Sequence, residues 1–128
     1  DIRQKMANIE QESANNKDLT LCIALSYGSR QEILVAVKKA MMLVSDKKIK
    51  PEDMTLEKFS SLLYTADIPD PDILIRTSGE QRISNYLLWQ LAYTELFFTD
   101  TLWPDFDKKE LIDIIQKFST RERRYGKS

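Results

Sequence analysis

The chain contains no histidine, and this absence narrows the chemistry open to it. Imidazole bases, histidine-containing triads and histidine-rich zinc sites are excluded, which leaves carboxylates, arginine, lysine, serine and backbone groups. That inventory suits magnesium, which prefers oxygen ligands, better than zinc. The single cysteine, Cys22, excludes a disulfide within the chain. Because Cys22 lies in the apolar run LTLCIALS, we expect a small buried residue rather than a reactive thiol.

The sequence also lacks an apolar run long enough to span a bilayer and an opening of signal-peptide type. Its formal net charge is only −1 although 30% of the residues are charged. No large uniform field for nucleic acid or anionic lipid is implied, so an anion site has to be local. We therefore expect a cytoplasmic protein that does not bind nucleic acid. The 128 residues, 42% of them hydrophobic, suffice for one domain or part of one.

Strand and helix patterns alternate along the chain and predict an α/β fold with a mostly parallel sheet flanked by helices. Strands are expected at residues 19–25, which are nearly all apolar, in DILIR and near TELFFTD. Helices are expected at residues 2–14, from Ser29 past Val44, and at residues 55–64, 85–92 and 107–123. Capping boxes are predicted for Ser29 with Glu32 and for Asp107 with Glu110, and Thr55 is expected to cap the third helix. The inward faces should carry Ile33, Val37, Ala40, Met41, Val44, Leu111, Ile114, Ile115 and Phe118.

Two features indicate that flanking sequence completes this sheet. A sheet of at most three strands would expose long apolar edges to solvent. The chain also opens on Asp1, within a helical pattern that has no start signal ahead of it. We therefore expect a piece of a longer protein.

The stretch DILIRTSGEQRISNYLLWQ, residues 72–90, combines an apolar strand, two arginines and a predicted helix start capped by Ser84 or Asn85. Ligands of open α/β sheets gather beyond the carboxyl ends of the strands, where helix N-termini offer free N–H groups. Arg76, Arg82 and the helix start would form a good receptor for phosphate or diphosphate, because guanidinium groups bind such anions bidentately. The alternative is that both arginines merely pair with Glu80 or with Asp72 or Asp70 on a solvated loop, and the spacing alone does not decide between the two interpretations.

Two further regions contain candidate groups. Glu95 and Asp105 follow the predicted site, and a carboxylate close to a diphosphate could hold Mg²⁺; the commoner alternative is a surface glutamate on an edge strand. The tail RERRYGKS is either a solvated helix end or an arm of Arg124, Tyr125 and Gly126 that reaches a diphosphate in a neighbouring subunit. The apolar run NYLLWQLAYTELFF is either core or the seat of a dimer partner.

The stretch DILIRTSGEQRISNYLLWQ resembles the signature of the cis-prenyltransferases, the family of the bacterial undecaprenyl diphosphate synthases (isoprenyl transferases). LAYTELFFTDTLWPDF and RERRYG continue the resemblance, and LTLCIALSYGSRQEI is similar to an upstream strand, turn and helix of that family. The resemblance covers nearly all of the chain. It implies a cis-prenyltransferase fold and a magnesium-dependent homodimeric enzyme. Such an enzyme condenses isopentenyl diphosphate with an allylic diphosphate, such as farnesyl diphosphate, into a long cis-polyprenyl diphosphate for the cell-wall lipid carrier, and its lipid product implies a peripheral place at the membrane.

The resemblance also implies roles for particular residues. Isopentenyl diphosphate would be bound by Arg76, Arg82, Ile83, Ser84, Arg124 and Gly126, the last two in an Arg-x-Gly tail that approaches the substrate across the dimer, and magnesium would be bound by Glu95. Asp105 matches a family aspartate near the site, and its role is left open.

The sequence also departs from the family pattern. The family's MDGNGRWA-like loop, whose aspartate is the catalytic centre, has no match here, so no catalytic residue is assigned. We expect residues 1–128 to be the C-terminal portion of a single domain and to be inactive alone. Ser26 and Ser29 replace asparagine and glycine of many members, and Gln81 replaces a histidine found in some. Product length and allylic substrate cannot be predicted from these residues.

Two other functions are compatible with the pattern. A non-catalytic partner subunit would keep the dimer face and the tail but lose the chemistry, whereas the presence of Arg76, Arg82, Ser84 and Glu95 favours the catalytic interpretation. An unrelated α/β phosphate-binding module would leave the length of the motif match unexplained.

Overall fold

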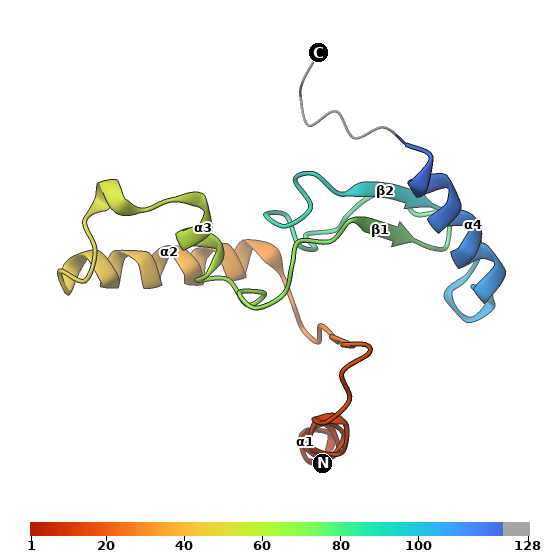
Figure 1. Cartoon of the computed structure of the whole chain (residues 1–128), viewed down its shortest axis with the longest axis horizontal. Helices are drawn as coiled ribbons and strands as arrows, with labels where there is room; N and C mark the ends of the chain where they lie inside the picture. The colour runs from red at the N-terminus through yellow and green to blue at the C-terminus, as the bar shows by residue number, and fades with distance from the viewer. Residues whose placement is uncertain (122–128) are drawn as a thin grey trace.

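Two short parallel strands position the candidate site (Figure 1). The computed structural model describes residues 1–121, and within them β1 (Ile73–Arg76) pairs with β2 (Glu95–Phe98), with Ile73 opposite Glu95 and Arg76 opposite Phe98. Their aliphatic and aromatic residues suit a pleated, half-buried surface. The strands expected at DILIR and near TELFFTD are confirmed.

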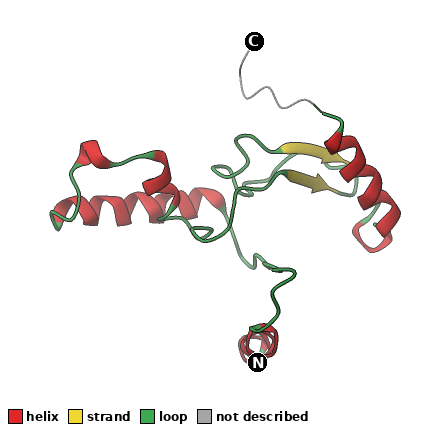
Figure 2. Cartoon of the chain, viewed as in Figure 1, coloured by secondary structure: helices red, strands yellow, loops and turns green. Residues whose placement is uncertain are grey.

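The described residues also form four α-helices, and Figure 2 shows the first of them set apart from the rest of the chain. In the described part of the chain these are α1 (Ile2–Ser13), α2 (Ser29–Ser45), α3 (Leu56–Ser60) and α4 (Lys108–Ser119), with single 3₁₀ turns η1 (Pro51–Asp53) and η2 (Trp103–Asp105). The predicted caps Thr55 and Asp107 are confirmed, because their side chains accept from Lys58 N at 3.2 Å and Glu110 N at 2.9 Å. The α3 helix ends at Ser60, earlier than predicted, because residues 61–67 continue as turns.

The strand predicted at residues 19–25 is wrong. These residues have no regular structure, and they run in the open between α1 and α2 (Figure 1). Leu19 is 83% and Leu21 80% exposed, and Cys22 is exposed rather than buried as expected. A strand needs a neighbour to accept its ladder hydrogen bonds. No described segment pairs with this run, so its apolar composition alone does not make it a strand.

The described chain leaves much of its apolar surface uncovered. Its accessible surface is 10,881 Å², whereas a folded monomer of 14.9 kDa exposes about 7,000 Å². The buried hydrophobic residues in the described part are Ala36, Leu63, Phe97 and Ile114. The predicted inward face of α2 lines an open groove of about 550 Å³ together with Pro51, Met54 and Phe59. None of the helices described in residues 1–121 combines the length and apolar character needed to cross a membrane.

The capping box predicted at the start of α2 is also wrong. Gly28 is the N-cap residue, and the side chain of Glu32 is completely buried instead of returning to the helix start. Its carboxylate accepts hydrogen bonds from the Tyr27 hydroxyl, from Tyr64 N at 2.8 Å and from Gln90 Nε2 at 3.3 Å. A side chain with three tertiary donors is not available for local capping. Glu32 therefore ties α2 to the segment before β1 and to the segment between β1 and β2.

Candidate functional site

Arg76 and Arg82 face a common pocket at the end of β1. The pocket has a volume of about 190 Å³ and is lined by Leu74, Ile75, Arg76, Arg82, Ile83 and Tyr86. Arg76 is the last residue of β1, so it stands at the carboxyl end of the strand, where the sequence placed it. The structure thus brings together three of the predicted ligand residues. Tyr86, which also lines the pocket, had been assigned only to an apolar helix.

The loop between the two arginines is fixed by backbone hydrogen bonds. Ser78 N donates to Thr101 O at 2.8 Å and Gly79 N to Thr99 O at 2.9 Å, while Thr99 N donates to Arg76 O at 2.9 Å. Gly79 has a φ of +68°, and a β-carbon there would lie 3.1 Å from Asp100 Oδ1. Glycine is therefore favoured on two grounds, its left-handed backbone and the close approach of the Asp100 side chain.

The helix predicted at residues 85–92 is wrong. The segment forms consecutive turns, and Ser84, Asn85 and Leu87 have φ of 48°, 63° and 46°. Its polar groups serve the start of α2 instead. Asn85 Oδ1 accepts from Arg30 N at 3.0 Å and Asn85 O from Ser29 N at 2.8 Å. Ser84 is exposed and does not line the pocket, so the expected helix terminus is not part of this anion receptor.

The two arginines of the pocket differ in their charged partners. Arg82 forms an ion pair with Glu80, and its side chain is 65% exposed, so this pair contributes little to stability. For Arg82, the alternative interpretation of pairing with Glu80 on a solvated loop is therefore confirmed. Within residues 1–121 no carboxylate pairs with Arg76, although that residue is partly buried. A partly desolvated guanidinium without a counter-ion is a strong site for an anion.

Glu95 does not share the pocket with Arg76. Glu95 stands at the opposite end of the register, three steps from the Arg76–Phe98 pair, or about 10 Å along the strands. Successive residues of a strand point to alternate faces, so Glu95 shares its face with Phe97 and not with Arg76. Within the described residues, Glu95 and Arg76 therefore lie at opposite ends and on opposite faces of the two-stranded sheet.

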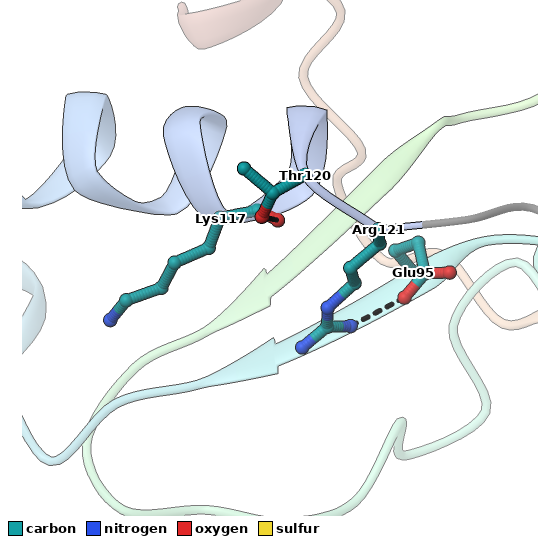
Figure 3. Close-up of polar contacts among 4 residues, drawn as sticks. All are labelled: Glu95, Lys117, Thr120 and Arg121. Atoms are coloured by element: carbon teal, nitrogen blue, oxygen red, sulfur yellow. Dashed lines mark hydrogen bonds and ion pairs between the residues drawn. The ribbon is translucent and has the colours of Figure 1, made fainter.

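Glu95 instead interacts with Arg121, just beyond the end of α4 (Figure 3). Its Oε2 accepts from Arg121 Nη1, with the two side chains 27% and 46% exposed. The Arg121 guanidinium also lies 4.4 Å from the centre of the Phe97 ring. No group of three acidic or other metal-ligating side chains occurs in the described residues. A magnesium ion takes one or two carboxylates and completes its shell with phosphates and water, so Glu95 alone supplies one ligand and does not form a site.

The remaining predicted residues lie away from this pocket or outside the described range. Asp105 is exposed in η2, and its N–H donates to Leu102 O at 2.9 Å. The predicted tail residues Arg124 and Gly126 fall outside residues 1–121.

A partly buried tyrosine, Tyr27, lies beside Glu32 at the start of α2. Burial raises the pKa of the Tyr27 hydroxyl to about 12, and its hydrogen bond to Glu32 adds to the shift because ionised tyrosine would face a carboxylate. The Tyr27 ring packs edge-on against Tyr86 at 5.6 Å, so this buried cluster contacts a lining residue of the pocket. Sequence reasoning missed it, since the Ser29–Glu32 spacing matches a local cap and carries no signal of burial.

With this geometry in place, comparison with known proteins defines the class of protein. The sequence profile of the family described as "Putative undecaprenyl diphosphate synthase" matches residues 1–126, so the chain belongs to this prenyltransferase family. It is 52% identical over 128 residues to the isoprenyl transferase of Porphyromonas gingivalis and 51% identical over 125 residues to that of Fusobacterium nucleatum. These alignments cover 100% and 98% of the chain but 50% and 51% of the relatives. The chain thus spans about half the length of the curated relatives it matches.

Solved structures agree with the family. Lavandulyl diphosphate synthase from Lavandula x intermedia, in complex with dimethylallyl diphosphate, superimposes with a TM-score of 0.91 at 36% identity, covering 98% of this chain and 54% of that one. The "probable undecaprenyl diphosphate synthase" of Campylobacter jejuni gives 0.81 at 35% identity, covering 98% and 56%. The predicted α/β cis-prenyltransferase fold is confirmed.

Proposed function

We propose that this chain supplies the isopentenyl diphosphate site of a cis-prenyltransferase that builds a long polyprenyl diphosphate for the cell-wall lipid carrier. The observation that carries the proposal is Arg76, a partly buried cation without a carboxylate partner in residues 1–121, in one pocket with Arg82. Family membership supports the reaction class. The name "isoprenyl transferase", shared by relatives about half identical to the chain, supports it further.

In this proposal the two guanidinium groups hold the diphosphate of isopentenyl diphosphate by bidentate hydrogen bonds. The apolar lining residues Leu74, Ile75 and Ile83 suit the isoprene part of the substrate. Condensation forms a carbon–carbon bond between the isopentenyl double bond and the allylic carbon. The allylic carbon–oxygen bond breaks, pyrophosphate leaves, and one proton is lost. The residues described here bind and orient one reactant, and the group that ionises the allylic diphosphate is not assigned to this chain.

The proposal requires Arg82 to exchange Glu80 for the ligand. An exposed ion pair is worth about 0–1 kcal/mol, whereas a hydrogen bond to a charged group contributes about 1.5–3 kcal/mol. A diphosphate with several charged oxygens therefore competes well with the single carboxylate of Glu80. Arg76 has no such competitor among the described residues, so it is the stronger of the two anchors.

Other parts of the proposal depend on groups outside the pocket. Glu95 would contribute one oxygen to Mg²⁺, whose other ligands are substrate phosphates and groups outside residues 1–121, after release from Arg121. Arg124 and Gly126 would reach the diphosphate of a partner subunit in a homodimer. Ser84 would join the ligands only if residues 84–87 rearranged. We place the protein in the cytoplasm, with its lipid product delivered at the membrane surface.

Nothing favours the alternative of a non-catalytic partner subunit. Both relatives compared above are named as transferases, and Arg76, Arg82, Ser84 and Glu95 are all present.

The proposal is tested by isothermal titration of isopentenyl diphosphate into the chain and into R76A, R82A and the double variant. Each single change removes charge-assisted hydrogen bonds, so we expect about 10-fold to 100-fold weaker binding, with the larger loss for R76A. Arg3→Ala on the exposed helix α1 removes the same charge far from the pocket and should bind like the unmodified chain. Equal binding by the double variant and the unmodified chain would rule out this pocket.

A further inference from the structure

Glu110 lies in the first turn of α4 but does not cap it in the predicted reciprocal manner. Its backbone N–H donates to Asp107 Oδ1, while its side chain turns toward the loop after β2. Glu110 Oε1 accepts from the hydroxyl of Thr99 and from that of Thr101 at 3.1 Å. A carboxylate has only acceptor positions, so it fixes the direction of both hydroxyl protons.

The two threonines are also the residues that hold the loop between the arginines. Thr101 N donates to Thr99 Oγ1 at 3.2 Å, which closes residues 99–101 into a tight turn. The carbonyls of this turn accept from Ser78 N and Gly79 N. A continuous hydrogen-bonded path therefore joins Glu110 to the backbone midway between Arg76 and Arg82.

Two residues in the loop between Arg76 and Arg82 have an uncommon backbone conformation. Ser78 and Gly79 are both left-handed, with φ of 67° and 68°. A left-handed non-glycine residue is unfavourable and persists only where its surroundings hold it. The hydrogen bonds that Ser78 N and Gly79 N donate to the carbonyls of Thr101 and Thr99 supply that support, and Asp100 lies against Gly79.

We propose that Glu110, acting through Thr99 and Thr101, is a positioning residue for the arginine pair. It holds residues 77–82 in the shape that presents both guanidinium groups to one diphosphate. The identity of the ligand rests on the function proposed above, whereas the coupling from Glu110 to the loop rests on the hydrogen bonds alone. A purely structural role would stabilise the start of α4 and leave the loop unchanged, so the two roles differ in what they predict for Ser78 and Gly79.

The test combines amide hydrogen exchange with titration of isopentenyl diphosphate. For E110A we expect exchange at Ser78 and Gly79 to accelerate by about tenfold and binding to weaken by about 3-fold to 10-fold. E110Q retains an acceptor oxygen and should fall between E110A and the unmodified chain. Asp113→Ala, an exposed acid on the same helix, is the matched control and should change neither quantity.

Thr99→Val provides a second route to the same result if E110A does not fold. It removes, at nearly constant volume, the hydroxyl that donates to Glu110 and accepts from Thr101 N, and T99S, which keeps the hydroxyl, should restore slow exchange and tight binding. Faster exchange along α4 with no change at Ser78 and Gly79 would overturn the coupling. Faster loop exchange with unchanged affinity would overturn the positioning role. If the unmodified chain bound no diphosphate, the proposed function and the positioning of a diphosphate would both fail, and exchange at the two amides would still decide whether Glu110 holds the loop.

Discussion

Asn85 offers a quantitative test of how the segment after Arg82 is held. Its side chain caps α2 by accepting from Arg30 N at 3.0 Å, and its own φ is 63°. Replacing Asn85 by alanine removes the cap, which costs about 1 kcal/mol. It also places alanine in the left-handed region, which costs about 1 kcal/mol more. Asn85→Gly loses the same cap without the steric cost, so the two variants separate the contributions.

The assay is urea unfolding followed by circular dichroism. With a slope of about 2 kcal/mol/M, N85A should lower the unfolding midpoint by about 1 M and N85G by about 0.5 M or less. The hydrogen bond from Ser29 N to Asn85 O survives in both variants, which limits the loss. Equal midpoints for N85A and N85G would refute the left-handed contribution, and unchanged midpoints in both would refute the capping role.

Three other predictions concern the buried cluster and the chemistry. Because the pKa of Tyr27 is raised from about 10 to about 12, its contribution to stability is complete below pH 10 and is lost between about pH 10 and 12. When unfolding of the chain and of Y27F is compared across that range, the chain that retains Tyr27 should lose additional unfolding free energy. Glu32→Ala leaves Tyr64 N–H and Gln90 Nε2 without their buried acceptor, so we expect a loss of about 3 kcal/mol in urea unfolding, with E32Q losing less. The 128-residue chain alone should show no condensation of labelled isopentenyl diphosphate with farnesyl diphosphate, and measurable product would contradict this.

Local sequence signals correctly predicted both strands and two of the helix caps. The strands around Ile75 and Phe97 were predicted from composition and the caps at Thr55 and Asp107 from local spacing, and all are confirmed. The position of Arg76 at a strand end followed from the same signals. Residues 73–83 therefore gave a correct location for the pocket without knowledge of its neighbours.

The errors fall where tertiary partners replace local ones. Residues 85–92 have an apolar helical pattern, but Asn85 Oδ1 accepts from Arg30 N and Leu88 N donates to Ser29 Oγ, both at the start of α2. Glu32 has the spacing of a capping residue, but three tertiary donors surround its carboxylate. Residues 19–25 have the composition of a buried strand but no described neighbour. The face to which Glu95 points depends on strand register, which no short motif encodes.

The central claim is that Arg76 and Arg82 bind one diphosphate together. The most direct measurement is to follow the side-chain Nε–H resonances of both arginines by NMR while isopentenyl diphosphate is added. The account predicts that both resonances shift with the same dissociation constant, that the Arg3 resonance stays in place, and that in R76A the shift at Arg82 needs about 10-fold to 100-fold more isopentenyl diphosphate. Shifts at Arg82 that persist unchanged in R76A, or that follow a different dissociation constant, would contradict a shared site.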